Sequence, residues 1–392
     1  MNKILFDLTK SQSIRGVKYH GGGKYGIVIC KYFITNFPNW LAVYYNDSLY
    51  IDEECVELCR KHQIESYVTS EGSIVDIAEK RGYIIYSPLF NKDYLNSKDV
   101  KIICTIHGLR SLEMPSDKFE SLYYRKRGLL NRILTVLGLN GLKKIVQNKF
   151  QTATIKKQYQ SIFCSEQIHI ITVSEHSKAS LMCYFPSLLS SEIRVFYSPS
   201  TINASIPLKT NAFSSSKYWL MVSGDRWQKN CLRAILAFDQ LFHERPDLDG
   251  IVVITGLKEL AFKKVAISHR DRFVCVGYVD EIQLKSLYHD AYALIYPSLN
   301  EGFGYPPLEA MHEGCPVAAS AISSIPEVCG EAVLYFNPLM QDEIKMRILQ
   351  MEDLEIRKYY VEKGKAREQQ IKKRQQRDLQ ELADYLLKFT GF

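Results

Sequence analysis

Short apolar runs alternate with longer polar stretches along most of this 392-residue chain, and this alternation is the strongest constraint on its fold. In the first half the runs have the length of strands, and most of the stretches between them are polar and helix-forming. Short buried strands separated by helices indicate a parallel sheet that is covered on both faces. The strands predicted for this half are Lys3–Leu8, Leu41–Tyr45, Tyr83–Tyr86, Lys101–Ile106 and Ile168–Val173.

The stretch YSPSTINASIPLKTNAFSSSK at residues 197–217 interrupts this alternation, because its Ser, Thr, Pro and Asn residues are typical of a linker. The alternation then restarts. We therefore expect an α/β protein with two doubly wound, Rossmann-like domains, whose ligands bind beyond the carboxyl ends of the strands, in the cleft between the domains. The strands predicted for the second half are Tyr218–Val222, Ile251–Ile254, Arg272–Val276, Tyr292–Tyr296 and Val333–Phe336.

The predicted domain boundaries follow from these patterns. Residues 1–200 form the first domain, residues 201–217 the linker and residues 218–365 the second domain. Residues 366–392 belong to a charged helical stretch that starts at about Leu354, and the first domain is a candidate surface for its packing. Only the end of this stretch has a regular apolar face, so the remainder is expected to be solvated. The apolar positions of that face are Leu379, Leu382, Leu386 and Leu387.

Two patterns bear on the cellular compartment. The apolar part of the N-terminal MNKILFDLTKSQ is too short for a signal peptide, and no apolar run approaches the roughly 20 residues of a membrane-spanning helix. Ten cysteines are scattered singly, apart from Cys55 and Cys59, and none forms a CxxC pair or a cluster with zinc spacing. We therefore expect a cytoplasmic protein with reduced, mostly buried thiols and no metal site.

Residues 125–157 are strongly basic and contain no acidic residue. Apolar residues recur there at helical spacing, and Gly138 and Gly141 are expected to separate two short helices. A basic amphipathic helix favours an anionic membrane surface, near which each Lys or Arg contributes about 1 kcal/mol. The alternatives are a helix with its apolar face in the core, and a nucleic-acid site, although no nucleic-acid motif accompanies the charge.

The segment YPSLNEGFGYPPLEAM at residues 296–311 is the strongest candidate for a functional site. A buried strand is predicted to end at its first residue, and Pro306 and Pro307 suit the first turn of a helix, where a missing N–H costs little. The loop between strand and helix therefore places backbone N–H groups at a helix N-terminus, which favours anions or sugar hydroxyls. The residues of this loop are Gly302, Phe303, Gly304 and Tyr305.

Two glutamates, Glu301 and Glu309, lie eight residues apart in the same segment. Carboxylates accept hydrogen bonds from vicinal hydroxyls, which sugars and riboses present, and both groups are expected to stay ionised near a helix N-terminus. A capped helix with incidental acidic residues is the alternative.

The string EGFGYPPLE resembles the paired-glutamate motif of the family 4 retaining glycosyltransferases, which have the GT-B fold. The downstream strings GCPVAAS and SSIPEVCGEAVLYFNP match the continuation expected in that family. The resemblance covers most of the second half of the chain and, more loosely, the first half. It implies that Glu301 contacts hydroxyls of the transferred sugar and that Glu309 holds the ribose of the nucleotide.

The stretch SGDRWQKNCLRAILAF at residues 223–238 follows the first predicted strand of the second domain and opens a helix. Arg226 and Lys229 lie in this turn with Gly224, where cations can hold a diphosphate. Two exposed cations in a loop are the alternative. The resemblance implies that an Arg and a Lys at this position neutralise the leaving nucleoside diphosphate.

A third turn, VGYVDE at residues 276–281, follows a strand that is predicted to end at Gly277. Asp280 is suited to cap the next helix, and an ordinary strand–loop–helix explains these residues nearly as well. The resemblance implies that Gly277 and Tyr278 flank the nucleotide base.

The first half contributes two further candidates. The string HGGGKYG at residues 20–26 lies between a strand and a helix, where Gly22 and Gly23 let the backbone approach a ligand, and it resembles the Gly-rich loop of the family. His107 follows a predicted strand and is suited to hydrogen-bond the sugar or the acceptor, with a loop-stabilising role as the alternative. The family often has Asp after this His, where this chain has Gly108, and many relatives have Asn-Gly where this chain has YSPS at residues 197–200.

We therefore predict a metal-independent, retaining hexosyltransferase that needs no cofactor. Its donor is a GDP-, UDP- or dTDP-linked sugar, with mannose as the favoured hexose. Its acceptor is a glycan on a polyprenyl diphosphate, in the synthesis of a bacterial O-antigen, capsule or exopolysaccharide. Residues 125–157 are expected to contact the inner face of the cytoplasmic membrane, and nucleic acid is not an expected partner. The alternatives are a nucleotide-sugar epimerase or hydrolase on the same fold and a non-catalytic scaffold of a polysaccharide assembly complex.

Overall fold

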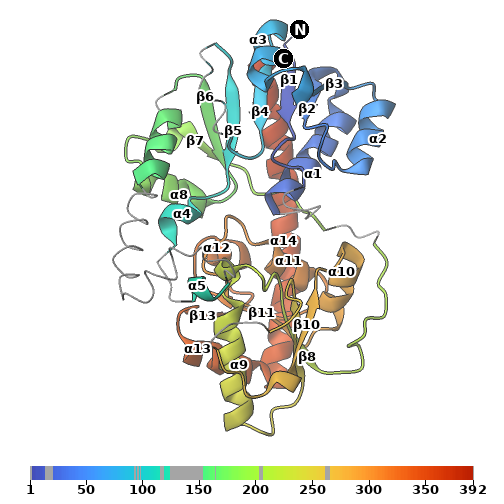
Figure 1. Ribbon diagram of the computed structural model, residues 1–392, viewed down its shortest axis with the longest axis vertical. Coiled ribbons are helices and arrows are strands. Elements are labelled where there is room, and N and C mark those ends of the chain that lie inside the picture. The colour runs from blue at the N-terminus through green and yellow to red at the C-terminus, as the bar shows by residue number, and fades with distance from the viewer. Residues whose placement is uncertain are drawn as a thin grey trace, which may run out of the picture. The chain divides into compact units, whose positions relative to one another are not determined.

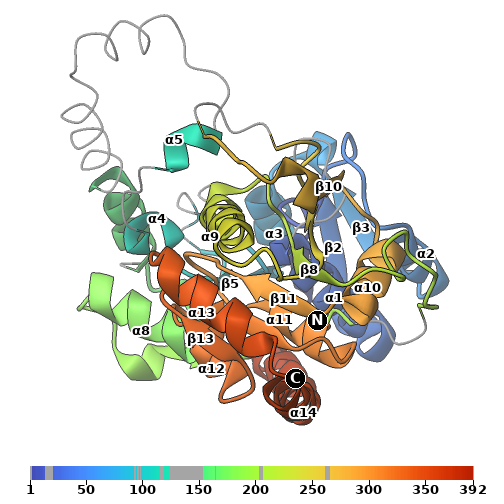
Figure 2. The ribbon, with the colours of Figure 1, turned by 90° about the horizontal axis from the view of Figure 1, so that it is seen from below.

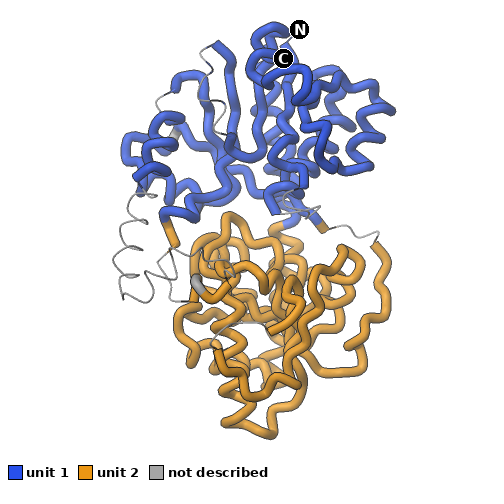
Figure 3. The backbone as a smooth tube through the Cα atoms, viewed as in Figure 1, with its two compact units in different colours: residues 1–112, 150–201, 372–392 blue, residues 113–149, 202–371 orange. Residues whose placement is uncertain are grey.

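The computed structural model divides into two compact units, which are coloured separately in Figure 3. Unit 1 contains residues 1–112, 150–201 and 372–392, and unit 2 contains residues 113–149 and 202–371. Most of the basic stretch at residues 125–157 lies outside the described part of the chain, and residues 153–157 belong to a helix at 153–163. The described residues are 2–13, 21–91, 94, 97, 99–114, 119–123, 153–163, 165–202, 206–260 and 265–391.

Unit 1 is built on a seven-stranded sheet with the order β3-β2-β1-β4-β5-β6-β7, in which every neighbouring pair is parallel. β2 and β3 lie on one side of β1, and β4 to β7 lie on the other (Figure 1). This is the doubly wound arrangement that the alternating pattern predicts. The strand bounds are β1 Ile4–Asp7, β2 Leu41–Tyr45, β3 Glu65–Val68, β4 Ile84–Ser87, β5 Ile102–Ile106, β6 Ile168–Thr172 and β7 Ile193–Val195.

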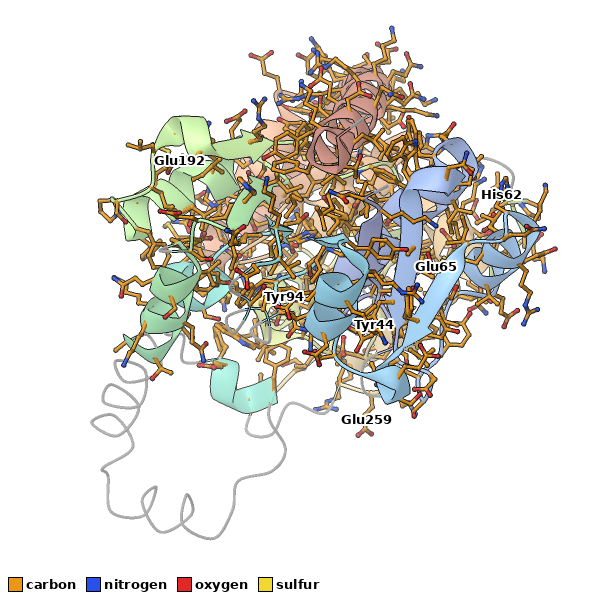
Figure 4. All side chains as sticks on the ribbon, turned by 90° about the horizontal axis from the view of Figure 1, so that it is seen from above. Tyr44, His62, Glu65, Tyr94, Glu192 and Glu259 are labelled. Carbon is orange, nitrogen blue, oxygen red and sulfur yellow. The ribbon has the colours of Figure 1, made fainter. Side chains whose placement is uncertain are left out.

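Helices cover both faces of this sheet. On one face, α3 packs its buried Ile74 and Ile77 against strand residues, in a cluster that also holds Tyr44 and Tyr94 (Figure 4). On the other face, Tyr25 of α1 reaches Tyr86 of β4 through a hydroxyl–hydroxyl contact of 3.2 Å. The main helices of this unit are α1 Gly21–Asn36, α2 Glu53–Lys61, α3 Ile74–Arg81 and α8 Glu175–Tyr184. The short α4 Arg110–Glu113 lies where the chain passes from unit 1 into unit 2.

Unit 2 is built on a six-stranded parallel sheet with the order β10-β9-β8-β11-β12-β13. The amphipathic α9 packs with α13 over one face, and its Phe238 lies against Trp219 in the core (Figure 2). The strands are β8 Tyr218–Met221, β9 Ile251–Thr255, β10 Phe273–Gly277, β11 Ala293–Tyr296, β12 Val317–Ser320 and β13 Leu334–Phe336. The helices are α5 Glu120–Tyr123, α9 Cys231–Glu244, α10 Glu281–Asp290, α11 Tyr305–His312, α12 Ile325–Cys329 and α13 Gln341–Met351.

The last helix, α14 Leu354–Leu387, is continuous and contributes to both units. The expectation that its charged middle is simply solvated is wrong, because several polar side chains there bind backbone groups. Arg367 donates to the Val328 carbonyl at 2.9 Å, Gln375 donates to the Ser198 carbonyl at 2.7 Å, and Asp378 accepts from the Tyr197 N–H at 2.9 Å. These bonds fix a helix whose sequence alone shows little apolar periodicity.

The fold class predicted from the sequence is confirmed, since both units are parallel α/β sheets covered by helices. The cysteines in the described ranges are free thiols, and most of them are buried, as their scattered spacing predicts. None of the helices in those ranges combines the length and the hydropathy that crossing a bilayer requires.

Candidate functional site

Lys229 and Glu301 form a buried ion pair in unit 2. Lys229 Nζ lies 2.6 Å from Glu301 Oε1 and 2.8 Å from the hydroxyl of Tyr296, and both charged side chains are only 10% exposed. Tyr296 itself donates to Glu301 Oε1 at 2.7 Å, and the Ser298 hydroxyl donates to the same oxygen. The contacts of this carboxylate within the described residues all fall on Oε1. The second oxygen, Oε2, is therefore available to accept hydrogen bonds from a ligand.

The charge state of this cluster follows from its contacts. Burial raises the pKa of Glu301, but the Lys229 ammonium, together with hydrogen bonds from Lys229, Ser298 and Tyr296, outweighs burial and holds the pKa below its usual value. Burial and the neighbouring Glu301 charge raise the pKa of Tyr296 well above its usual value. Glu301 is therefore a carboxylate and Tyr296 a neutral phenol at neutral pH, as expected from the sequence for the glutamate.

The turn before α9 explains why Lys229 is buried. Asn230 has a left-handed φ of 56°, and its side-chain amide donates to the carbonyls of Pro297 and Pro338 at 3.0 and 2.8 Å. The N–H of Leu299 donates to the carbonyl of Gln228 at 2.8 Å. These bonds hold the turn against the loop after β11, so the alternative of two exposed cations is wrong for Lys229.

Arg226 and Gly224 lie earlier in the same turn. The Arg226 side chain is partly exposed and makes no hydrogen bond or ion pair with any described residue, so the structure does not bring it to the Lys229–Glu301 pair. At Gly224 a Cβ atom would lie 2.7 Å from Ile254 Cγ2, which shows that close packing against β9 requires this glycine. Gly224 therefore has a structural reason that is independent of any ligand.

The loop from Glu301 to Gly304 is fixed by two serines. Ser323 accepts from the N–H of Glu301 at 2.9 Å, and the Ser324 hydroxyl is 2.9 Å from the carbonyls of both Glu301 and Phe303. Gly304 has a φ of 107°, which favours glycine, and Pro306 lies in the first turn of α11 as predicted. The aromatic ring of Phe303 is buried, whereas Gly302 is partly exposed.

Glu309 lies in the second turn of α11 and is held from a different helix. The hydroxyl of Tyr288, in α10, lies 3.1 Å from Glu309 Oε2. Burial, and then the Glu309 charge, raise the pKa of Tyr288 well above its usual value, so this phenol is a neutral hydrogen-bond donor. Each of the two paired glutamates thus has a buried tyrosine as a partner.

The third predicted turn is present, with β10 ending at Gly277 and Asp280 capping α10. The N–H of Gly277 donates to the Leu257 carbonyl at 2.6 Å, and its carbonyl accepts from the Gly256 N–H. Its backbone groups are therefore used within the fold. The neighbouring Tyr278 is 66% exposed, so its ring is accessible from solvent.

The first-half candidates belong to unit 1. Gly22 and Gly23 lie in the first turn of α1, not in a loop before it, and a Cβ atom at Gly22 would lie 2.7 Å from a Leu89 methyl. His107 follows β5, and its Nε2 lies 2.9 Å from the Pro88 carbonyl. Because a carbonyl only accepts, Nε2 carries a proton in this contact. The Tyr25 ring meets His107 edge to face at 4.6 Å, which fixes the imidazole from a second side.

Residues 204–376 match the family model described as glycosyl transferases group 1. This part of the chain belongs to the group 1 glycosyltransferases. The match contains Lys229, Glu301 and Glu309, and it confirms the resemblance that the string EGFGYPPLE carries.

Two curated relatives of this chain are O-antigen mannosyltransferases. O-antigen chain mannosyltransferase RfbU of Salmonella typhimurium is 30% identical over 174 residues, which are 43% of this chain and 47% of that protein. O-antigen chain mannosyltransferase B of Escherichia coli is 30% identical over 193 residues, 46% of this chain and 50% of that protein. The chain thus spans about half the length of the curated relatives it matches.

Solved structures of low sequence identity share the whole fold. HepE of Anabaena, solved in complex with UDP, has a TM-score of 0.63 at 14% identity, over 98% of this chain and 100% of that chain. Sucrose-phosphate synthase from Thermosynechococcus elongatus has a TM-score of 0.64 at 15% identity, and the match covers 100% of both chains. These likenesses confirm the GT-B fold that the sequence predicts.

Sequence reasoning missed two residues of the candidate site, Tyr288 and Tyr296. The apolar pattern identifies Tyr296 only as the last residue of a buried strand, although it lies five residues before Glu301. A tyrosine at the carboxyl end of a parallel strand brings a hydroxyl to the edge where ligands bind, and that signal was present. Tyr288 carries no comparable signal, because its contact with Glu309 joins two helices.

Proposed function

We propose that the protein is a retaining hexosyltransferase that transfers mannose from a nucleoside-diphosphate sugar to a glycan during the synthesis of a bacterial surface polysaccharide. The observation that carries this proposal is the buried Lys229–Glu301 pair in a glycosyltransferase domain. It combines a cation for a diphosphate and a carboxylate for sugar hydroxyls within one cluster. The choice of mannose is supported by the two O-antigen mannosyltransferases, and the donor class by neighbours solved with UDP and UDP-glucose.

Lys229 and Glu301 still have unused hydrogen-bonding capacity for the donor. An ammonium has three donors, and Lys229 uses two of them on Glu301 and Tyr296, which leaves one for a phosphate oxygen. Glu301 offsets the charge of Lys229, so Arg226 and the N-terminus of α11 supply additional positive potential. Glu301 Oε2 accepts from hydroxyls of the sugar, Glu309 accepts from the ribose, and Tyr278 lies against the base.

The reaction breaks the bond between the anomeric carbon and the diphosphate and forms a bond from that carbon to the acceptor oxygen. The leaving phosphate oxygen takes the proton of the acceptor hydroxyl, so the acceptor attacks from the face that the diphosphate leaves and the configuration is retained. Lys229 and Arg226 stabilise the charge that develops on the diphosphate, without a metal ion and without a cofactor. His107 hydrogen-bonds the sugar or the acceptor, and Gly22 and Gly23 allow the backbone of α1 to approach them.

The acceptor is proposed to be linked to a polyprenyl diphosphate at the inner face of the cytoplasmic membrane. The support for this is the charge pattern of residues 125–157, which matches an anionic lipid surface. Flotation with vesicles containing anionic lipid tests it, because charge reversal at Lys143 and Lys144 is expected to release the protein. Equal flotation of the variant and the wild type would contradict the membrane contact.

The proposal is tested first by thermal shift with GDP, UDP, dTDP and their sugars, and then by a transfer assay. A ligand at 100 times its dissociation constant adds about 2.7 kcal/mol of stability. We expect one nucleotide to stabilise the wild type but not Lys229→Ala, and the product to keep the anomeric configuration of the donor. Consumption of the donor without an acceptor would indicate an epimerase or hydrolase, and binding without turnover would indicate a scaffold.

A further inference from the structure

A short stretch from the first half of the chain belongs to unit 2. The chain leaves unit 1 after Leu112, contributes residues 113–149 to unit 2 and returns to unit 1 at Phe150. The described parts of residues 113–123, here called the brace, are residues 113–114 and 119–123, which include α5. Figures 1 and 2 show α5 close to the start of α9, and α5 contacts the turn Trp227–Lys229.

The first contact of the brace caps α9. The Leu232 N–H is one of the first four N–H groups of this helix, which have no partner within the helix. The residue at the N-cap position, Asn230, makes no side-chain cap, and its side-chain oxygen accepts from the Arg233 guanidinium at 2.6 Å. Instead, the hydroxyl of Tyr123 accepts from the Leu232 N–H at 2.9 Å. The tyrosine of the brace therefore does the work of a capping residue.

The second contact fixes the same turn from its side. The guanidinium of Arg233 lies 4.7 Å from the centre of the Phe119 ring, which is a cation–π distance. Arg233 also donates to the side-chain oxygen of Asn230 at 2.6 Å. Phe119 thus holds an arginine that in turn holds the residue directly after Lys229.

The third contact reaches the other half of the buried pair. The side-chain amide of Asn300 donates to a carboxylate oxygen of Glu113. Asn300 directly precedes Glu301, and it is buried. The brace therefore contacts both loops that carry the Lys229–Glu301 pair, through three side chains of different chemistry.

We propose that the brace positions Lys229 and Glu301 for catalysis, so that the first half of the chain supplies positioning residues to the donor-binding loops. The role in catalysis rests on the proposed function, whereas the contacts themselves do not. Loosening either loop displaces the ammonium or the carboxylate from the reacting groups, and small displacements of such groups cost large factors in rate. The loss is expected in kcat, because these three contacts of the brace involve neither Tyr278 nor Glu309, the residues proposed to hold the base and the ribose.

The contact at α9 is tested without any ligand by amide hydrogen exchange. Tyr123→Phe removes the acceptor of the Leu232 N–H, and we expect exchange at the start of α9 to accelerate by about tenfold, the order of a lost cap. Tyr218→Phe is the matched control, since the Tyr218 hydroxyl is also hydrogen-bonded, to the Leu287 carbonyl at 2.7 Å, in the same unit. Equal exchange at the start of α9 in the two variants would contradict the capping of α9 by Tyr123.

The role in catalysis is tested by separating kcat from KM for the nucleotide-sugar. We expect Glu113→Ala and Tyr123→Phe each to lower kcat by roughly three- to tenfold with little change in the donor KM, as displaced catalytic groups do. Glu113→Gln keeps an oxygen that accepts from Asn300 and should retain most of the activity. If Tyr123→Phe exchanges faster at the start of α9 but has the same kcat as Tyr218→Phe, the positioning role is overturned. A different outcome is that the Leu232 amide of the wild type is protected, but the protein neither binds nor turns over any nucleotide-sugar. That outcome would overturn the proposed function and would leave the contact between Tyr123 and α9 valid.

Discussion

The hydroxyl of Tyr296 donates to Glu301 at 2.7 Å while it accepts from the ammonium of Lys229 at 2.8 Å. It is therefore the third member of a closed triangle, whose other side is the 2.6 Å ion pair. A phenol in this position can stabilise both charges only while it remains neutral, and burial together with the Glu301 charge ensures this by raising its pKa.

Removal of this hydroxyl is expected to affect both stability and catalysis. Tyr296→Phe leaves the ring in the core but deletes two hydrogen bonds to charged partners, so we expect a loss of about 1.5 to 3 kcal/mol in the free energy of unfolding and a roughly tenfold drop in kcat. Urea unfolding and steady-state kinetics measure the two effects. Tyr218→Phe, which also loses a buried hydroxyl, should reproduce part of the first effect and none of the second. Similar kcat values for the two variants would contradict the prediction.

Breaking the ion pair on one side is expected to be costlier than removing both charges. Lys229→Ala leaves Glu301 buried without its cation, which typically costs about 3 to 5 kcal/mol, whereas Lys229→Met combined with Glu301→Gln removes both charges and should recover much of that loss. Both proteins should lack transferase activity. The measurement is urea unfolding at neutral pH, and a double variant no more stable than Lys229→Ala would show that the charge itself is not the cause.

A surface network in unit 1 is expected to make stability depend on acid pH. Burial acts to raise the pKa of Glu65, which is labelled in Figure 4. Hydrogen bonds from Tyr67, Tyr83 and Lys3 outweigh burial and lower this pKa to about 2. Because the folded pKa lies below the unfolded value, the contribution to stability is fully present above the unfolded pKa and is lost as the pH falls toward 2. The stability of Glu65→Gln should therefore fall less steeply than that of the wild type between pH 5 and pH 2, measured by urea unfolding. Parallel curves would contradict the prediction.

Gly304, the glycine with positive φ before α11, allows the effect of backbone strain to be distinguished from an effect on ligand binding. A Cβ atom at Gly304 would have only Ile325 within 4.0 Å, so Gly304→Ala is opposed by its φ of 107° and not by a clash. Gly72, with a φ of 143° and no neighbour within 4 Å, offers a control of the same kind in unit 1. We expect each Ala variant to lose about 1 kcal/mol or more of stability, while only Gly304→Ala weakens nucleotide binding in a thermal-shift titration. Equal binding by both variants would contradict a ligand role for this loop.

The sequence predicted the strands that are continuous apolar runs, each within one residue of its observed bounds. It missed β3, β7 and β12 for identifiable reasons. β3 (ESYV) is an edge strand with partly exposed residues, β7 has three residues, and β12 (VAAS) is built from small side chains. None of the three has the run of large apolar residues that marks a buried strand.

The paired glutamates and the Arg–Lys turn were predictable because both lie in local strings at strand-to-helix junctions. The pairing of Lys229 with Glu301 was not, since 72 positions separate them and only the adjacency of β8 and β11 brings their loops together. The tyrosine partners and the brace are missed for the same reason. Tyr123 lies 109 positions before Leu232, and nothing local indicates that its hydroxyl caps a helix in the other half of the chain.

The continuity of α14 has a practical consequence for anyone who wishes to divide or recombine this protein. A fragment ending at residue 201 would leave the Tyr197 N–H and the Ser198 carbonyl without Asp378 and Gln375, and would lack part of its own unit. We therefore expect that a single cut in the linker gives a first fragment that does not fold on its own. A chimaera that exchanges the first half of the chain between relatives must carry residues 372–392 with it. Those residues, added as a separate peptide, should restore the solubility of the truncated fragment.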